Sequence, residues 1–218
     1  MSTIVDKIKH SKELIKDAVE KYTPKIAVAS SWGKDSMVLL HLALQIDQNI
    51  KVISVITPFK PKETLLFKDK IVKKWKLNYS EYRAEGDNLP VGLWKTDPDR
   101  CCYIYKVEPF KRAVQDLDCW LSGIRSKEGR TRGDYEEIEE SGTLVKINPL
   151  LKWEEIDIWK YAALYQVPMN PLYQLGYRSL GCEPCTSIID DDEPERAGRW
   201  KGTNKCGGEC GIHTTKLR

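Results

Sequence analysis

Four of the cysteines occur as two tight pairs that lie far apart in the sequence. Cys101 and Cys102 are adjacent, and Cys182 and Cys185 form a C-x-x-C element. Two such pairs can supply four thiolates to one metal centre, either a zinc ion or an iron–sulfur cubane. Cysteines at structural zinc sites are usually separated by two to four residues, so the adjacent pair favours the cubane. Buried free thiols and a redox-active C-x-x-C pair are the alternatives.

Cys210 lies in a different setting, within a glycine- and charge-rich tail that has no apolar periodicity. Such a segment is typically exposed and mobile, so we expect it to deliver its thiol to something bound elsewhere in the protein. His213 follows three residues later and is expected to orient or tune that thiol, unless it belongs to a solvated chain end. Cys119 lies in an apolar run that predicts a core residue, and Cys206 could be a resolving thiol, a further ligand or incidental.

A polar loop after the first apolar segment is suited to binding an anion. Apart from Trp32, it consists of Ser30, Ser31, Gly33, Lys34, Asp35 and Ser36. A loop that leads into a helix presents unpaired backbone N–H groups and the positive end of the helix dipole, which suit a phosphate or sulfate. The serine hydroxyls would add donors, Lys34 would add positive charge, and Gly33 would let the backbone approach the ligand. Ordinary capping of the helix by a serine or aspartate is the alternative.

Two arginines near the end of the sequence could also bind an anion. Arg196 and Arg199 are three residues apart and would share one face of a helical turn, where guanidinium forks match phosphate and sulfate oxygens. The acidic run at 190–193 offers surface ion pairing instead, and the residues alone favour that interpretation. Arg130 and Arg132 belong to a basic loop, for which solvent exposure is the simpler interpretation.

The elements expected to position these residues alternate between strands and helices. Apolar patterns predict strands at 25–29, 51–56, 79–82, 119–123 and 143–147. One helix is predicted directly after the polar loop, and others are predicted at 3–22, 61–75, 103–115 and 153–165. This alternation predicts a mainly parallel, doubly wound α/β sheet of the Rossmann type, which binds ligands outside the carboxyl ends of its strands. Residues 84–100 are predicted to form a loop, and the chain from 168 onward to be mostly irregular.

The composition is that of one folded domain with an extension. The chain has 218 residues, of which 41% are hydrophobic and 31% are charged, so it should bury a substantial core. Its formal net charge of +3 is too small to argue for a nucleic-acid partner. No apolar run reaches membrane-spanning length and the charged N-terminus lacks a signal-peptide core, which predicts a cytoplasmic protein without membrane attachment.

The polar loop resembles that of a known family. Its segment Ser31-Trp32-Gly33-Lys34-Asp35-Ser36 is similar to the Ser-Gly-Gly-Lys-Asp-Ser loop of PP-loop proteins, with Trp32 in place of the first glycine. These proteins bind adenine nucleotides and include ATP pyrophosphatases and sulfonucleotide reductases. The resemblance implies an adenine nucleotide α-hydrolase-like fold. It also implies a nucleotide-binding α/β domain at 1–165 and a C-terminal extension at 166–218, integrated into one domain.

Further motifs resemble the sulfonucleotide reductases, which comprise the adenylyl-sulfate (APS) and phosphoadenylyl-sulfate (PAPS) reductases. The matching segments are Arg100-Cys101-Cys102 with Lys106 and Pro109, Gly181-Cys182-Glu183-Pro184-Cys185-Thr186, Glu195-Arg196-Ala197-Gly198-Arg199-Trp200, and the tail Glu209-Cys210-Gly211-Ile212-His213. In that family the four paired cysteines bind a 4Fe–4S cluster. The likeness runs from the loop at residue 30 to residue 213 and implies the same cluster here.

The resemblance implies thiol-dependent reduction of APS to sulfite and AMP in sulfate assimilation. Cys210 would attack the sulfate sulfur and carry a cysteine S-sulfonate, which thioredoxin or a glutaredoxin-like dithiol would then reduce. The nucleotide would lie at the polar loop, with His213 at the same site. Lys106 would lie between cluster and substrate. The residues implied to contact the phosphosulfate are Lys106, Arg125, Arg196 and Arg199.

Other activities stay open. The family commonly has Asp-Thr-Gly after the second strand, where this chain has Ile56-Thr57-Pro58, so PAPS is the alternative substrate. An ATP-dependent sulfur transferase acting on RNA or DNA would instead use Lys34 on pyrophosphate, although the Cys210 motif argues against it. A non-catalytic redox sensor would leave the anion loop and the paired arginines without a purpose. The sequence is also compatible with a homo-oligomer.

Overall fold

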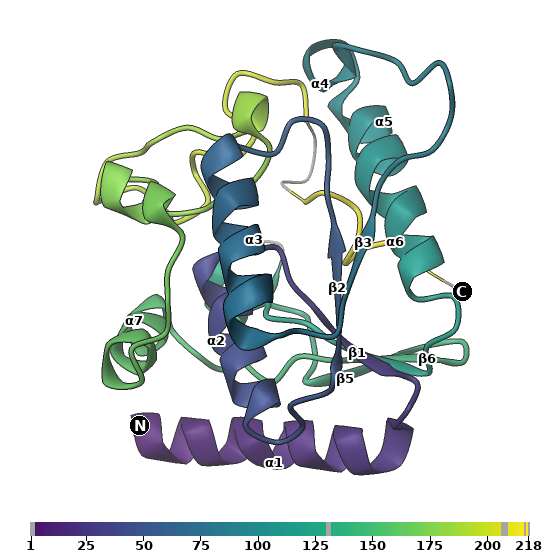
Figure 1. Cartoon of the computed structure of the whole chain (residues 1–218). Helices are drawn as coiled ribbons and strands as arrows, with labels where there is room; N and C mark the ends of the chain where they lie inside the picture. The colour runs from purple at the N-terminus through teal and green to yellow at the C-terminus, as the bar shows by residue number, and fades with distance from the viewer. Residues whose placement is uncertain (1–2, 130–131, 206–208, 216, 218) are drawn as a thin grey trace.

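The computed structural model describes residues 3–129, 132–205, 209–215 and 217, and within these residues the strands form one six-stranded sheet. The strands are β1 (Ile26–Ala29), β2 (Lys51–Val55), β3 (Tyr79–Tyr82), β4 (Cys119–Leu121), β5 (Ile138–Ser141) and β6 (Leu144–Ile147). Their order is β3-β2-β1-β4-β6-β5, and neighbours are parallel except for β5 and β6. The predicted mainly parallel α/β sheet is confirmed (Figure 1).

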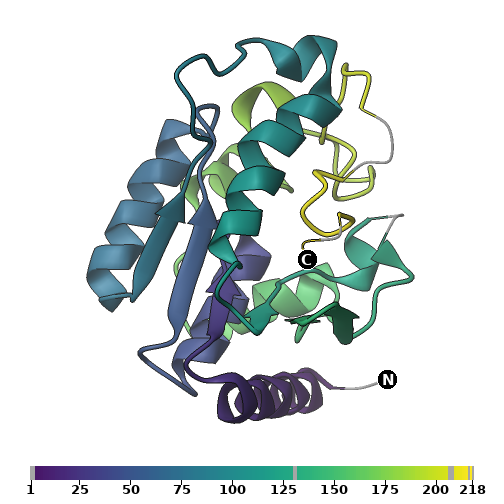
Figure 2. The ribbon, with the colours of Figure 1, turned by 90° about the vertical axis from the view of Figure 1, so that its right-hand side faces the viewer.

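Helices cover both faces of this sheet (Figures 1 and 2). They are α1 (Ile4–Tyr22), α2 (Lys34–Leu44), α3 (Lys62–Trp75), α4 (Leu93–Thr96), α5 (Pro98–Cys102), α6 (Glu108–Ala113) and α7 (Glu155–Leu164). Successive strand residues point to opposite faces, so Val28 joins the larger core with α1, α2, α3 and α7. Its neighbour Ala27 joins a smaller core with α6, where Phe110 packs edge-on against Trp120 with ring centroids 4.8 Å apart.

Some predicted boundaries are wrong. Strand β5 is missing from the predicted strands because its Ile-Glu-Glu-Ser sequence is charged and it forms an edge of the sheet. Residues 84–100 were predicted as a loop, but they contain the short helix α4 and most of the short helix α5. The helix predicted at 103–115 begins as the π-helix η1 (Tyr103–Val107) before it continues as α6. Such π-helical turns occur frequently at functional sites.

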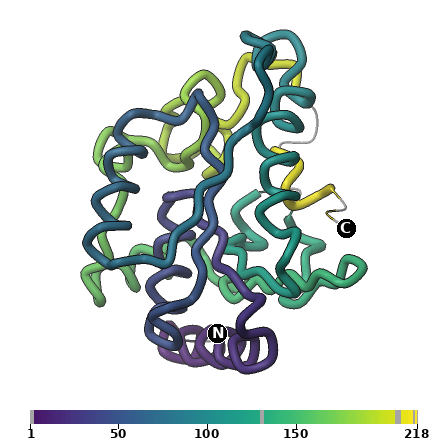
Figure 3. Tube along the Cα trace, turned by 45° about the vertical axis from the view of Figure 1, so that its right-hand side comes forward, coloured from purple at the N-terminus to yellow at the C-terminus, as the bar shows by residue number. Residues whose placement is uncertain are grey.

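The chain after α7 is mostly irregular, as predicted, with the 3₁₀ turns η4 (Pro171–Leu175) and η5 (Glu183–Cys185). Figure 3 shows this late segment, in green to yellow, at the end of the molecule opposite α1. Gly198 lets it pack tightly, because a Cβ atom there would lie 2.2 Å from the Ser187 carbonyl oxygen. The domain division at residue 165 stays a prediction. Within the described part of the chain, no helix is both long and apolar enough to cross a membrane.

Candidate active site

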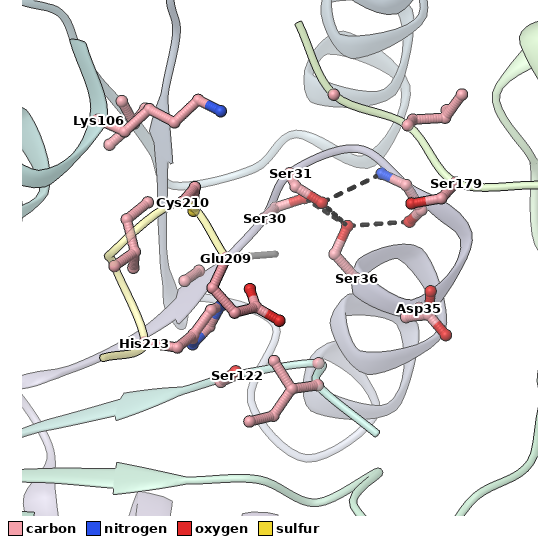
Figure 4. Close-up of a pocket in the computed structure, with 18 of the residues that line it drawn as sticks. Ser30, Ser31, Asp35, Ser36, Lys106, Ser122, Ser179, Glu209, Cys210 and His213 are labelled. Atoms are coloured by element: carbon pink, nitrogen blue, oxygen red, sulfur yellow. Dashed lines mark hydrogen bonds between the residues drawn. The ribbon is translucent and has the colours of Figure 1, made fainter. Parts of the chain in front are cut away.

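The loops that follow β1, β2 and β4 enclose a cavity together with the late segment and the tail (Figure 4). The polar loop lines it with Ser30, Ser31, Gly33, Lys34, Asp35 and Ser36. Other parts of the chain line it with Lys106, Arg196, Arg199, Cys210 and His213. The structure therefore brings together the predicted catalytic and substrate-binding residues, with the exception of Arg125.

The polar loop places a glycine at the N-cap of α2, so the N-cap residue makes no side-chain cap. Trp32 has φ 67°, in the left-handed region that glycine adopts without strain, which explains the glycine at this place in the PP-loop pattern. Its side chain is fully buried and packs edge-on against Tyr79, with ring centroids 5.6 Å apart. The N-cap of α2 is Gly33, so the alternative of capping by a serine or aspartate is wrong. The Tyr173 hydroxyl accepts from the first N–H of the helix, that of Lys34, at 2.8 Å. An anion could satisfy this helix start.

Three serine hydroxyls gather beside the start of α2. The Ser36 hydroxyl donates to the Gly33 carbonyl oxygen at 2.9 Å. The hydroxyl oxygens of Ser30 and Ser31 lie 3.5 Å and 3.4 Å from that of Ser36. Figure 4 shows this group facing the middle of the cavity, with Cys210 across from it. The arrangement offers hydroxyl donors to a ligand that lies between the loop and the tail.

Lys34 and Arg125 are buried cations whose charge is matched by carboxylates. The Lys34 ammonium pairs with Glu195 and lies 3.4 Å from Asp35 Oδ2. Arg125 Nε donates to Asp35 Oδ1 at 2.5 Å, and its Nη2 donates to Glu195 Oε2 at 2.6 Å. Burial would raise the pKa of Asp35, but Lys34 and Arg125 lower it overall, so this carboxylate is charged. Arg125 does not line the cavity and supports the polar loop from behind, so its substrate contact stays a prediction.

The basic loop contributes a second group of ion pairs. Arg132 is buried, so the expected solvent exposure of this loop is wrong for that residue. Its guanidinium pairs with Glu128 and donates from Nε to Glu209 Oε1 at 2.7 Å. Arg196 contacts the same two carboxylates, with nitrogen–oxygen distances of 3.2 Å to Glu128 and 3.4 Å to Glu209. This network ties the loop after β4 to the tail.

Three further cations, which are half-buried, line the cavity without an ion pair to any carboxylate of the described residues. They are Lys60, Lys106 and Arg199. Lys60 Nζ donates to the Ser31 carbonyl oxygen at 3.2 Å, and Arg199 Nη1 donates to the Leu180 carbonyl oxygen at 2.8 Å. Burial lowers the pKa of Lys60 to about 8. Burial would also lower the pKa of Lys106, but neighbouring cysteine thiolates raise it overall.

The four paired cysteines line a second, smaller cavity beside the first. Cys101 and Cys102 lie on α5, Cys182 and Cys185 lie at η5, and all four are buried free thiols. The other lining side chains are Phe59, Trp94, Pro98, Tyr105 and Lys106. A donor set of thiols without carboxylate or imidazole neighbours in the lining fits an iron–sulfur cluster or a zinc ion. Lys106 lines both cavities, so its ammonium can interact with a negative charge bound in either of them.

The tail enters the first cavity, so the predicted solvent exposure of this segment is wrong for Glu209 and for Cys210, which are buried and half-buried. Ile212 packs against the apolar cluster of α6 and β4. The His213 ring stacks on Trp120 with centroids 5.7 Å apart. Burial and basic neighbours lower the pKa of His213 well below its usual range, so its imidazole is neutral. The apolar contacts explain why a tail without periodicity has a fixed place.

Lys60 and Thr57 are among the residues of this region that were not identified as site residues from the sequence. Lys60 lines the cavity, and Thr57 Oγ1 lies 3.2 Å from Cys182 Sγ. Both follow β2 directly, and a place just after a parallel strand is the signal that could have found them. The residues considered from sequence that lie outside the described ranges are Arg130 and Cys206.

Comparison with known proteins gives a match to a family model, the phosphoadenosine phosphosulfate reductase domain, over residues 25–188. This range includes the polar loop and both cysteine pairs. The chain is similar to the adenosine 5'-phosphosulfate reductase of Oceanobacillus iheyensis, with 34% identity over 96% of this chain and 90% of that protein. It is also similar to adenosine 5'-phosphosulfate reductase 2 of Bacillus subtilis, with 33% identity over 96% of this chain and 92% of that protein.

Solved structures with the same fold include the phosphoadenylyl-sulfate (PAPS) reductase of Candida auris, with a TM-score of 0.71 and 24% identity over 87% of this chain and 98% of that chain. They also include the FMN adenylyltransferase of Candida glabrata, with a TM-score of 0.68 and 17% identity over 93% of this chain and 74% of that chain. These similarities confirm the adenine nucleotide α-hydrolase-like architecture indicated by the polar loop.

Proposed function

This chain belongs to the phosphoadenosine phosphosulfate reductase domain family, and we propose that it reduces APS to sulfite and AMP. One observation carries the proposal. The thiol of Cys210 shares a cavity with three cations, Lys60, Lys106 and Arg199, that have no carboxylate partner among the described residues. A substrate with a sulfuryl group on a phosphate would supply the missing negative charge next to that thiol.

The cavity offers separate surfaces for the parts of such a substrate. The serine hydroxyls and the start of α2 suit a nucleotide phosphate. The unpaired cations, together with Arg196, suit the phosphosulfate. Apolar side chains of the same lining, among them Ile53 and Val55 of β2, suit the flat face of a base. This division agrees with an adenylate whose reactive end points toward the tail.

The first chemical step is an attack by the Cys210 thiolate on the sulfate sulfur. A sulfur–sulfur bond forms, the bond between that sulfur and the bridging phosphate oxygen breaks, and AMP leaves with the bonding electron pair. A cysteine S-sulfonate remains on the chain, so one difficult reduction becomes two easier transfers. Lys106 and Arg199 line the same cavity as Cys210 and would stabilise the negative charge that develops on the leaving phosphate.

The second step needs a dithiol reductant, for which thioredoxin or a glutaredoxin-like protein is suited. Its thiolate attacks Cys210 Sγ, the bond to the sulfonate sulfur breaks, and sulfite leaves with the electron pair. The second thiol of the reductant then resolves the mixed disulfide and restores Cys210. The dithiol thus provides the two electrons that convert sulfur from the sulfate to the sulfite oxidation level. Because His213 is neutral and stacks on Trp120, its side chain is suited to holding the tail in place and not to donating a proton.

The four paired cysteines are proposed to hold a 4Fe–4S cluster. The support is their donor set, four buried thiols that face one small cavity from α5 and η5. A cluster bound there would supply a fixed charge beside Lys106 and no electrons for the reaction. Lys106, which lines both cavities, would then balance the cysteine side and the substrate side at once.

PAPS is the second candidate substrate, because this chain has Ile56-Thr57-Pro58 where APS reductases commonly have Asp-Thr-Gly. An ATP-dependent sulfur transferase fits the geometry less well. That activity would need the Lys34 ammonium at a pyrophosphate, whereas Glu195 and Asp35 hold it.

Anaerobic incubation of the holoprotein with thioredoxin and one of APS, PAPS or ATP tests the proposal. We expect sulfite and AMP in equal amounts from APS. Turnover of PAPS in preference to APS would select the second candidate. Conversion of ATP to AMP and pyrophosphate, with no sulfite from either sulfonucleotide, would overturn both.

A Cys210→Ser variant separates the catalytic assignment from the binding assignment. It should retain its iron, about four atoms per chain for a cubane, and should still bind nucleotide. It should form no S-sulfonate, measured by intact mass after one turnover without reductant. Sulfite formation by this variant would show that another group performs the attack, and zinc in place of iron would contradict the cluster.

A further inference from the structure

The tail is held to the body of the protein on both sides of Cys210. On one side, the Glu209 carboxylate accepts hydrogen bonds from Arg132, at 2.7 Å from Nε and 3.1 Å from Nη2. On the other side, Ile212 packs on the α6 apolar cluster and His213 stacks on Trp120. The turn between them, at Gly211, has φ 90° and lies so close to the body that a Cβ atom there would meet Val107 at 2.9 Å. The place of Cys210 therefore depends on both attachments.

The ion pair between Glu209 and Arg132 is buried, and its hydrogen bonds have a defined geometry. Glu209 is 6% exposed and Arg132 is 4% exposed. The two parallel hydrogen bonds between a guanidinium fork and a carboxylate fix orientation as well as distance. Arg132 comes from the loop after β4, and its second carboxylate partner, Glu128, comes from the same loop. Arg132 is thus anchored in the body and holds Glu209, whose neighbour in sequence is the reactive cysteine.

We propose that the Glu209–Arg132 pair is a latch that holds Cys210 toward the substrate cavity and must open before a second thiol reaches the sulfur. The kinetic part of this inference rests on the proposed function. Cys210 lines the inner cavity and also another, more open outer cavity with Asp99, Tyr103 and Lys205. A dithiol protein is too large to enter the inner cavity, so the tail has to move outward for it. Glu209 and Arg132 are positioning residues in this scheme.

A latch has opposite effects on the two half-reactions. A weakened latch leaves Cys210 aligned with the substrate for less of the time, so S-sulfonate formation becomes slower. The same weakening makes outward movement of the tail easier, so release of sulfite by the reductant becomes faster. A pair that only stabilises the fold would change both steps in the same direction.

The reactivity of Cys210 toward iodoacetamide measures opening without any substrate. The probe is added to the anaerobic holoprotein, and labelling of the tail peptide is followed by mass spectrometry. Glu209→Gln removes a negative charge beside the thiol and Arg132→Met removes a positive one, so an effect of charge alone would move the two rates in opposite directions. The latch predicts that both variants are labelled faster, by about tenfold, because each loses a charge-assisted hydrogen-bonded pair.

Lys127→Met is the matched control. Lys127 lies in the same loop as Arg132, but its ion pair is with Glu154 and is exposed, so wild-type labelling is expected. Because the Glu209–Arg132 pair is buried, both variants of it are expected to melt at a lower temperature than the wild type. Unchanged iron content and a melting temperature well above that of the labelling experiment show that the fold is intact under the assay conditions. Where Arg132→Met does not accumulate, Arg132→Lys keeps the charge but loses the bidentate fork, and the same increase is expected.

Single-turnover measurements complete the test, with S-sulfonate formation and sulfite release followed separately. For Glu209→Gln we expect slower formation, faster release and unchanged affinity for APS. Labelling rates that move in opposite directions, that fall, or that equal the wild-type rate would overturn the latch. Absence of S-sulfonate in the wild-type protein would instead overturn the proposed function, and the labelling result would still decide whether the pair restrains the tail.

Discussion

Two groups of cations surround one cavity, and they differ in what neutralises them. The matched cations are Lys34, in the polar loop, and Arg125, behind it, and they share the carboxylates of Asp35 and Glu195. The unmatched cations face the cavity and have no carboxylate partner among the described residues; they are Lys60, Lys106 and Arg199. Residue type alone does not distinguish the groups, since each contains a lysine and an arginine.

The difference separates structural charges from charges that await a ligand. A buried cation with its carboxylates in place cannot be transferred to a substrate without leaving those carboxylates unpaired. An unmatched cation has the opposite character, since a bound anion relieves its electrostatic cost. The pKa values agree with this division. Burial would lower the pKa of Arg125, but Asp35 and Glu195 raise it, whereas burial and the nearby Arg196 lower the pKa of Arg199.

Arg125→Met removes one of the matched cations and should have the largest effect on stability. This change leaves the half-buried Asp35 and the buried Glu195 with one cation, Lys34, between them. We expect the free energy of unfolding to fall by about 3–5 kcal/mol, as is typical when one partner of a buried ion pair is removed. Urea unfolding of the holoprotein measures it. Adding Glu195→Gln in the same chain should recover part of the loss, because it removes the carboxylate that was left unpaired.

Lys106→Met tests the other group. No carboxylate of the described structure loses its partner, so stability should stay near that of the wild type. The leaving phosphate loses a cation, so kcat/KM for APS should fall by about 100- to 1,000-fold. Steady-state sulfite assays with iron content determined in parallel measure both effects, and Lys127→Met serves again as the control with full activity. A variant that unfolds readily but keeps its activity per folded molecule would place Lys106 among the matched cations.

Local patterns predicted the elements that carry the chemistry, and they failed where partners are far apart in sequence. The polar loop and the cysteine pairs are short motifs, so their residues were identifiable. The ion pair of Arg125 with Glu195 spans 70 positions and that of Arg132 with Glu209 spans 77, and no spacing in the sequence indicates such pairs. For this reason the local pattern indicated an exposed loop for Arg132, and the burial of Arg125 was not foreseen. Both are buried because distant carboxylates are brought to them.

Lys60→Met is expected to have a smaller effect than Lys106→Met. Its Nζ contacts the Ser31 carbonyl oxygen, so a substrate at the polar loop would gain one charge-assisted hydrogen bond, and affinity for APS should fall about tenfold without it. Because burial lowers the pKa of Lys60 to about 8, its charge is lost as pH rises through that value. Wild-type affinity should therefore weaken between about pH 7 and about pH 9 more than that of the variant. Calorimetric titrations that show equal pH dependence would remove Lys60 from the unmatched group.

His213 is a third kind of group at this cavity, because it is a base that stays neutral among cations. Burial, followed by Arg132 and Lys146, lowers its pKa well below the ordinary value of 6.5. Below about pH 6.5 the unfolded chain takes up a proton that the folded chain does not, so the free energy of unfolding decreases as pH falls, by at most about 1.4 kcal/mol per pH unit. His213→Phe keeps an aromatic ring on Trp120 and should remove this part of the pH dependence.

Urea unfolding of the wild type and His213→Phe between about pH 5 and about pH 7 measures that difference in slope. A slope that is reduced in His213→Phe would show that the tail stays in the cavity until the whole protein unfolds. Equal slopes in the wild type and His213→Phe would mean that the tail leaves first and that His213 titrates in water. The cavity would then lose its apolar tail contacts at low pH, while the matched cations, Lys34 and Arg125, would keep their carboxylates.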